Sequence, residues 1–276
     1  MMANTVTRMV IVYAVQVALM VGALVFGQYS ANFFCGALWV TLFVLKIGTW
    51  WSWCYPLWLV ALCYITLQDP FSGYPWVIIP VTLGIFLVYG GWYVFSRTFR
   101  QALDQGLSLG DLTLYLGHRV IGAYSFSKII DESSEALVAT HNPLEVMNTH
   151  WVYSAGIIDF IVAFAAPLTA YWLYNSTRQT DASSQPAARP PTWLLLLVAL
   201  VNIIGFADFC VVGVGYSLLL LPGPLQMAGV KVSVIPMTHF PLAVLVIGLA
   251  PVSMLFHIVS LHRIVMLLRL PSPAKP

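Results

Sequence analysis

Long apolar runs alternate with short polar segments along the whole chain, and this alternation predicts a bundle of transmembrane helices. A helix needs about 20 mainly apolar residues to cross the hydrocarbon core of a bilayer. Helices are expected because a backbone in contact with lipid must satisfy its own hydrogen bonds, and these runs are continuous. We predict eight spans, at residues 9–26, 32–67 (two spans, divided around residues 46–51), 76–95, 112–130, 151–174, 192–221 and 240–266.

Composition supports a polytopic membrane protein and narrows the function classes. Of the 276 residues, 60% are hydrophobic and only 8% are charged, whereas a soluble globular protein carries about 25% charged residues. The four cysteines form no CxxC pair, which argues against a zinc site or a redox pair. The expected partner is the lipid bilayer; no basic domain indicates nucleic acid, and no motif identifies a cofactor.

One polar segment divides the chain between the sixth and seventh spans. Residues 175–191 are rich in Ser, Ala and Pro and are expected to form a flexible linker. We therefore predict a single integral membrane domain over residues 1–276, with six spans in residues 1–174 and two in residues 192–276.

The basic residues predict the orientation of the bundle. With eight spans, one side of the membrane carries only Lys128 and Lys231. Because cytoplasmic segments carry an excess of Lys and Arg, we expect both termini in the cytoplasm, and the bacterial inner membrane as the location in a bacterial cell. The opposite, cytoplasmic side carries Arg8, Lys46, Arg97, Arg100, Arg178, Arg189, Arg263, Arg269 and Lys275.

Three charged residues, Arg119, Asp159 and Asp208, lie near the middle of three consecutive spans. A charge at such a depth costs roughly 2.5–3.5 kcal/mol on insertion scales, so it normally faces a partner or a wet cavity. We expect Arg119 to pair with one of the two carboxylates. The three residues then form either a site for a proton, cation or polar substrate, or a structural ion pair that holds three helices together.

Two further polar residues join this predicted centre, Asn202 in the seventh span and His257 in the eighth. His257 shares a helical face with Ser253 and Ser260. A buried imidazole can hold haem or carry a proton, and His118 is the one clear candidate for a second haem ligand. A histidine that is simply hydrogen-bonded within the bundle is the favoured interpretation.

An acidic segment, residues 131–150, lies between the fifth and sixth spans and contains His141 and His150. Its carboxylates and imidazoles could bind a cation, but a solvated acidic loop is the favoured interpretation, so we predict no metal site.

Several motifs in the second half resemble an uncharacterised family of bacterial multi-span membrane proteins. The resemblance implies a helical membrane fold and draws attention to the same polar residues, but it implies no activity. The matching segments are RVIGAYSF (119–126), GIIDFIVAFAAP (156–167), NIIGFADF (202–209), PGPLQ (222–226) and, in the last span, MTHFPLAV and FHIVSLHRI.

The leading hypothesis from the sequence is a membrane protein that binds or moves a small solute or a proton through the centre formed by Arg119, Asp159, Asn202, Asp208 and His257. A membrane-embedded enzyme or haem-binding redox subunit is one alternative. A non-catalytic partner subunit of a membrane complex is another. The sequence assigns no catalytic residue.

Overall fold

A computed structural model describes residues 29–68, 70, 77–119, 149–181, 189–220 and 242–270. Within these ranges the chain is helical and contains no strand. The predicted first span, most of the acidic segment, the PGPLQ motif and residues 182–188 of the predicted linker lie outside the described residues. The same is true of residues 120–130, the greater part of the predicted fifth span.

Three of the helical segments are long and apolar enough to cross a membrane, which indicates association with a membrane. They are Gly156–Ser176, Thr192–Cys210 and Leu245–Arg269. Two shorter apolar helices, Gly36–Lys46 and Pro80–Phe95, accompany them. Their apolar side chains are exposed on the outer faces of the bundle, as expected of a surface that meets lipid.

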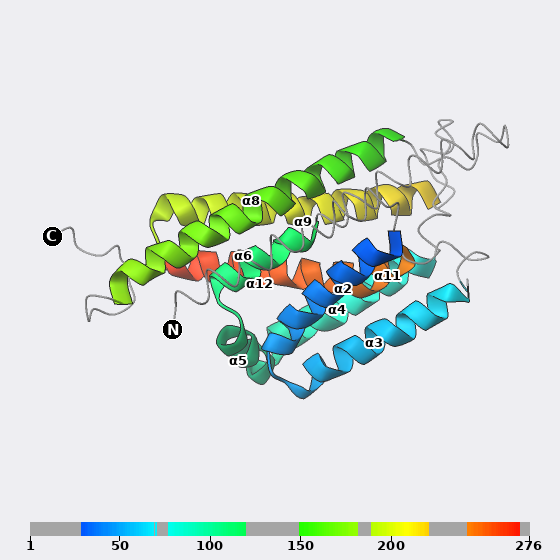
Figure 1. The fold of residues 1–276 in the computed structure, drawn as a ribbon, viewed down its shortest axis with the longest axis horizontal. Helices are drawn as coiled ribbons and strands as arrows, with labels where there is room; N and C mark the ends of the chain where they lie inside the picture. Colours follow the sequence, from blue (N-terminus) through cyan, green and yellow to red (C-terminus); the bar gives the residue numbers. More distant parts are fainter. Residues whose placement is uncertain are drawn as a thin grey trace.

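Helices α2 (Tyr29–Lys46), α3 (Trp50–Leu67) and α4 (Ile78–Phe95) form one side of the bundle (Figure 1). The turn between α2 and α3 falls where the sequence predicts it, because Gly48 takes a positive φ of 73° that other residues rarely adopt.

Helix α5 (Arg97–Gly106) is a short amphipathic helix that the apolar pattern does not predict. The Ser96 side chain accepts a hydrogen bond from the Phe99 backbone N–H and so caps its first turn. Phe99 and Leu103 are buried, while the polar side of α5 faces outward. Figure 1 shows α5 beside the ends of α2 and α4.

The described part of the predicted fifth span is a short helix, α6 (Leu109–Tyr115), followed by a 3-10 turn, η2 (Leu116–His118). Ser108 and Asp111 start α6 with a capping box, in which each side chain bonds the backbone N–H of the other residue. The chain then reaches Arg119, which is buried at the heart of the bundle.

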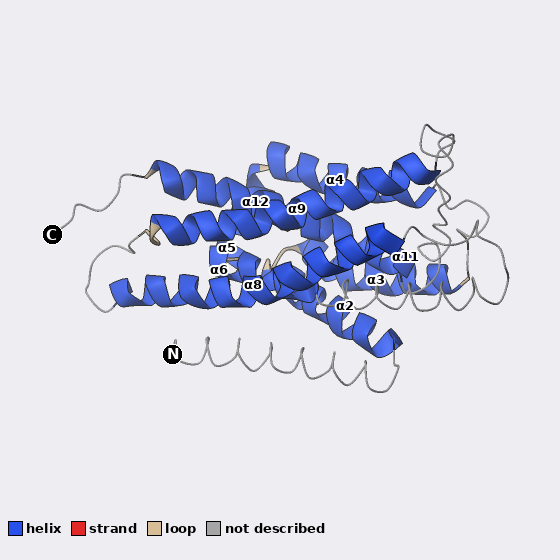
Figure 2. Ribbon diagram, turned by 90° about the horizontal axis from the view of Figure 1, so that it is seen from above, coloured by secondary structure: helices blue, strands red, loops and turns tan. Residues whose placement is uncertain are grey.

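The long helices α8 (Thr149–Asp181) and α9 (Thr192–Leu220) and the helix α12 (Ala250–Arg269) complete the bundle. Helix α9 packs against both α8 and α12, and α12 also packs against α4 and α6 (Figure 2). Helix α8 continues to Asp181. Residues 175–181, which were expected to begin the flexible linker, are therefore helical.

The last span contains a widened turn that the sequence analysis does not predict. A single α-helical turn, α11 (Leu242–Val244), leads into a π-helical segment, η4 (Leu245–Leu249), and then into α12. Pro251 explains the widening: it has no N–H, and its ring crowds the carbonyl four residues earlier, at Ile247. Such π segments occur frequently at functional sites.

Side chains from neighbouring helices bond the carbonyls of this widened segment. Tyr55 Oη donates to the Gly248 carbonyl over 3.0 Å, and Thr82 Oγ1 lies 3.3 Å from the Val246 carbonyl. In a lipid environment no water would take their place, so these donors stabilise the irregular turn.

We expect Tyr55→Phe to destabilise the protein by about 1–3 kcal/mol, because the buried Gly248 carbonyl loses its donor while the ring packing is kept. Thermal unfolding in detergent measures the effect. Tyr64→Phe on the same helix is the matched control, since Tyr64 is 66% exposed and its loss of a hydroxyl should leave stability unchanged. Equal effects of the two substitutions would contradict the explanation.

The described basic residues, apart from Arg119, gather at the end of the bundle that holds α5. Lys46 Nζ lies 2.6 Å from Asp111 Oδ1, and Arg263 bonds Asp104 and the Leu103 carbonyl. The helix directions add Arg97, Arg100, Arg178, Arg189 and Arg269 to the same end.

We expect the ion pair at this end to make part of the stability pH-dependent. Burial acts to raise the pKa of Asp111, but hydrogen bonds with Lys46, Ser108 and Tyr174, together with the Lys46 charge, outweigh it and lower the pKa. The stabilisation is therefore complete above the ordinary aspartate pKa of about 3.9 and is lost as pH falls through the lowered value. Measured in detergent, the gap in unfolding temperature between wild type and Asp111→Asn should narrow below about pH 3.9. A constant gap would contradict this account.

Candidate functional site: a buried arginine between two carboxylates

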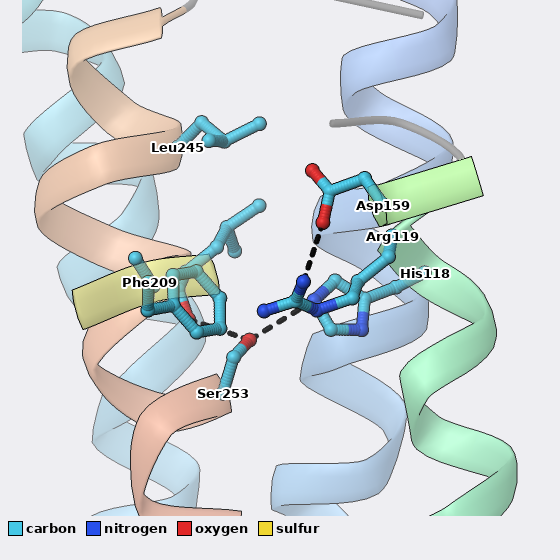
Figure 3. Close-up of a pocket in the computed structure, with 8 residues that line it drawn as sticks. His118, Arg119, Asp159, Phe209, Leu245 and Ser253 are labelled. Atoms are coloured by element: carbon cyan, nitrogen blue, oxygen red, sulfur yellow. Dashed lines mark hydrogen bonds and ion pairs between the residues drawn. The ribbon is translucent and has the colours of Figure 1, made fainter. Parts of the chain in front are cut away.

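Arg119 contacts both carboxylates of the predicted centre (Figure 3 shows its pair with Asp159). Its Nη1 lies 2.6 Å from Asp159 Oδ1 on α8 and 3.1 Å from Asp208 Oδ2 on α9. The side chains of Arg119, Asp159 and Asp208 are only 1%, 9% and 5% exposed. The expectation of a pair with one carboxylate thus becomes a three-member cluster that joins η2, α8 and α9.

The rest of the Arg119 guanidinium is held by α9. Nη2 donates to the Gly205 carbonyl over 2.5 Å, and the guanidinium carbon lies 4.1 Å from the centroid of the Phe209 ring. A cation stacked on an aromatic face gains electrostatic stabilisation. Arg119 Nε has no hydrogen-bond partner among the described residues, so one buried N–H remains available.

Charge does not balance in this cluster. Two carboxylates face one guanidinium, so the fully ionised cluster carries one net negative charge. The desolvation of an unbalanced buried charge is costly, and one bound proton removes it. The arrangement can therefore hold one exchangeable proton.

Asn202 and His257 join the cluster through Gly205. His257 Nδ1 lies 3.1 Å from Asn202 Oδ1, and Asn202 Nδ2 donates to the Val198 carbonyl over 2.8 Å. The imidazole fills the space beside Gly205, where an added Cβ would lie 2.5 Å from His257 Cε1. The structure thus brings all five predicted residues together, three by direct contact and two by packing.

A second polar group beside the cluster was not predicted as part of the site. His118 Nδ1 lies 2.7 Å from the Tyr115 carbonyl, and its Nε2 lies 2.9 Å from Ser253 Oγ. The Tyr115 hydroxyl is also 2.9 Å from Ser253 Oγ. The sequence offers one signal for this group: His118 adjoins Arg119, and Ser253 lies on the polar face of the last span.

Residues of both groups line one cavity of about 30 Å³, and Figure 3 shows these lining side chains. A cavity of this size holds about one water molecule. The π segment forms one wall, so the widened turn opens the space next to Arg119. The cavity is lined by His118, Arg119, Asp159, Phe209, Leu245, Leu249, Ala250 and Ser253.

The two histidines considered as haem ligands are engaged by protein atoms. His118 uses both ring nitrogens. His257 uses Nδ1 and its ring packs on Gly205, while its Nε2 has no hydrogen-bond partner among the described residues. Within the described ranges, no group of three or more His, Cys, Asp or Glu side chains is placed to hold a metal ion.

The fold and this centre define the class of protein: a membrane-associated helical protein with an arginine buried between two carboxylates. No protein-family model, no curated protein and no solved structure matches the chain.

Proposed function

We propose that this chain is a multi-pass membrane protein that binds and moves a proton through the Arg119 centre. In the proposal it has eight spans with both termini in the cytoplasm, and its immediate partner is the lipid bilayer. The observation that carries the proposal is the cluster itself, in which one buried guanidinium faces two carboxylates at 2.6 and 3.1 Å.

The cavity favours a proton over a larger solute. Its volume of about 30 Å³ suits a single water molecule. Asp159 lines this cavity, so a proton on its carboxyl group can exchange with that water.

Two alternatives remain from the sequence. In a non-catalytic partner subunit, the cluster would only hold helices together. A wholly structural ion pair needs one carboxylate, however, and the second one together with the adjoining water-sized cavity favours a working site. No contact favours a haem-binding redox subunit. Both ring nitrogens of His118 are hydrogen-bonded to protein atoms, so neither is free to bind haem iron. We also propose that the chain is related to the bacterial multi-span membrane proteins that its motifs resemble. This relation suggests no activity.

The test is proton flux into sealed lipid vesicles that contain the purified protein and a trapped pH-sensitive dye. With a membrane potential imposed, the wild-type protein should acidify the lumen. Asp159→Asn and Asp208→Asn should both abolish this flux. Each leaves one carboxylate paired with the Arg119 guanidinium, and this balanced pair no longer holds an exchangeable proton. Asp104→Asn is the matched control, since this aspartate is 59% exposed at the α5 end and should leave the flux intact. Equal flux in all variants would refute the proposal.

The proposed topology has its own test, by reporter fusion. Fusions after Arg100 and at the C-terminus should report the cytoplasm, because the basic residues gather at that end. Fusions within residues 131–150 should report the opposite side. A cytoplasmic signal from residues 131–150 would contradict the eight-span arrangement.

A further inference from the structure

We propose that His118 accepts the proton that Asp159 gives up. We propose further that the Ser253 hydroxyl controls the charge of His118 by changing its own hydrogen-bond partner when the imidazole becomes charged. This inference rests on the proposed proton function and names the group that receives the proton. His118 and Asp159 line the same cavity of about 30 Å³, His118 being 7% exposed overall. Among the described residues, they are the titratable groups besides Arg119 that line this water-sized space.

The hydrogen bond to Tyr115 fixes which imidazole nitrogen is basic. A carbonyl oxygen only accepts, so the 2.7 Å contact between His118 Nδ1 and the Tyr115 carbonyl requires a hydrogen on Nδ1. In the neutral ring Nε2 is then the acceptor. Because Nε2 points to Ser253, a wall of the cavity, the free base faces the place where a proton would arrive.

Ser253 has two acceptors for its single hydroxyl hydrogen. Its Oγ lies 2.9 Å from His118 Nε2 and 3.1 Å from the Leu249 carbonyl, the last residue of the π segment. While His118 is neutral, Ser253 donates to Nε2. Once His118 is charged, Nε2–H donates to Ser253 Oγ and the hydroxyl turns to Leu249. The Tyr115 hydroxyl donates to Ser253 Oγ in both states.

The proton balance of the step is simple. The Asp159 carboxyl group gives its proton to the cavity water, and that water gives a proton to Ser253 Oγ as the Ser253 hydroxyl hydrogen passes to His118 Nε2. The products are a carboxylate that faces Arg119 and an imidazolium whose Nδ1–H bonds the Tyr115 carbonyl. No bond other than O–H and N–H breaks or forms.

Charged and titratable groups from each packed helix act on His118. Burial of His118 disfavours the imidazolium, the Arg119 charge on the same segment opposes it as well, and a charged His257 on α12 would add to this opposition. The carboxylates of Asp159 on α8 and Asp208 on α9 favour it. His118 therefore holds the transferred proton only while both carboxylates are ionised, which couples His118 to the cluster.

The first test is nitrogen NMR of the full-length protein in lipid, with labelled histidine and with the His118 signal assigned by its loss in His118→Gln. We expect a neutral ring protonated at Nδ1 at high pH and an imidazolium at lower pH. A ring protonated at Nε2, or one that stays neutral at every pH at which the protein remains folded, would overturn the proposal.

The second test is proton flux in vesicles. His118→Gln should lower it on the order of 10²-fold, the usual loss when a proton-transfer group is removed. Ser253→Ala should lower it as well and should change the His118 titration. Ser260→Ala is the matched control: this serine is also fully buried on α12, but its hydroxyl has no partner among the described residues. A Ser253→Ala protein that behaves like Ser260→Ala overturns the switch.

Infrared spectroscopy separates this inference from the proposed function. A band of a protonated carboxyl group that disappears in Asp159→Asn or Asp208→Asn supports the proton-binding cluster by itself. If that band is present while His118→Gln leaves the flux unchanged, the cluster stands and the inference about His118 fails. If the band is absent from the wild-type protein, the proposed function fails first.

Discussion

Arg119→Leu should cost the protein about 3–5 kcal/mol of stability, the typical loss when one partner of a buried ion pair is removed. The substitution leaves Asp159 and Asp208 together in a buried site and also removes the donor to the Gly205 carbonyl. Arg119→Lys should recover only part of the loss, because an ammonium lacks the planar fork that reaches three acceptors. Thermal unfolding in detergent, at one pH and one detergent concentration, gives the comparison.

Double-mutant cycles supply the control for this result. Because Arg119 bonds both carboxylates, its substitution combined with Asp159→Asn or with Asp208→Asn should cost less than the sum of the single changes. The triple substitution, which removes every charge of the cluster, should cost less than Arg119→Leu alone. Arg97→Leu, at an exposed position on α5, should change stability little. Strictly additive effects would mean that the three charges do not act on one another.

Gly205→Ala should destabilise the protein by about 1–3 kcal/mol, the usual cost of overpacking a well-packed interior. The added Cβ would lie 2.5 Å from His257 Cε1 and 2.9 Å from His257 Nε2. The imidazole has to move, and its contact with Asn202 is lost with it. Because the Gly205 carbonyl also bonds Arg119, the proton flux should fall in this variant even where the protein remains folded.

Gly84→Ala is the matched control for that experiment. Gly84 lies within α4, and an added Cβ there would meet no atom within 4 Å. Alanine is favoured over glycine inside a helix by about 0.5–1 kcal/mol, so this variant should be unchanged or slightly more stable. If the two alanine substitutions behave alike, the contact with His257 does not limit the size of the residue at position 205.

The apolar pattern predicts the long helices well, because a long apolar run has few other structural explanations, and a charge or a turn residue inside such a run marks where one helix ends. Lys46 and Gly48 mark the turn between α2 and α3, and the predicted seventh span at residues 192–221 corresponds to α9 (Thr192–Leu220). The membrane helices themselves are indicated for three segments, and the count of eight stays a prediction. The polar centre is found from sequence for the same reason: an intramembrane Arg and Asp stand out against apolar neighbours.

The contacts that convert those residues into a site could not be predicted in the same way. Ser253 and His118 are far apart in the sequence, and nothing in either segment shows that their side chains meet. The short helix α5 is too polar to register as a span. The bonds from Tyr55 and Thr82 to the widened turn depend on how three helices pack, which a single-chain pattern does not encode.

The π segment also changes how the last span should be drawn on a helical wheel. Each residue advances an α-helix by about 100°, so one extra residue in a turn rotates everything after it relative to everything before it. A single wheel over residues 242–269 therefore assigns the wrong face to one half of the span. Treated as two half-helices with separate wheels, the part from Ala250 onward keeps Ser253, His257 and Ser260 on one inward stripe, and substitutions in the two halves have to be assigned to faces independently.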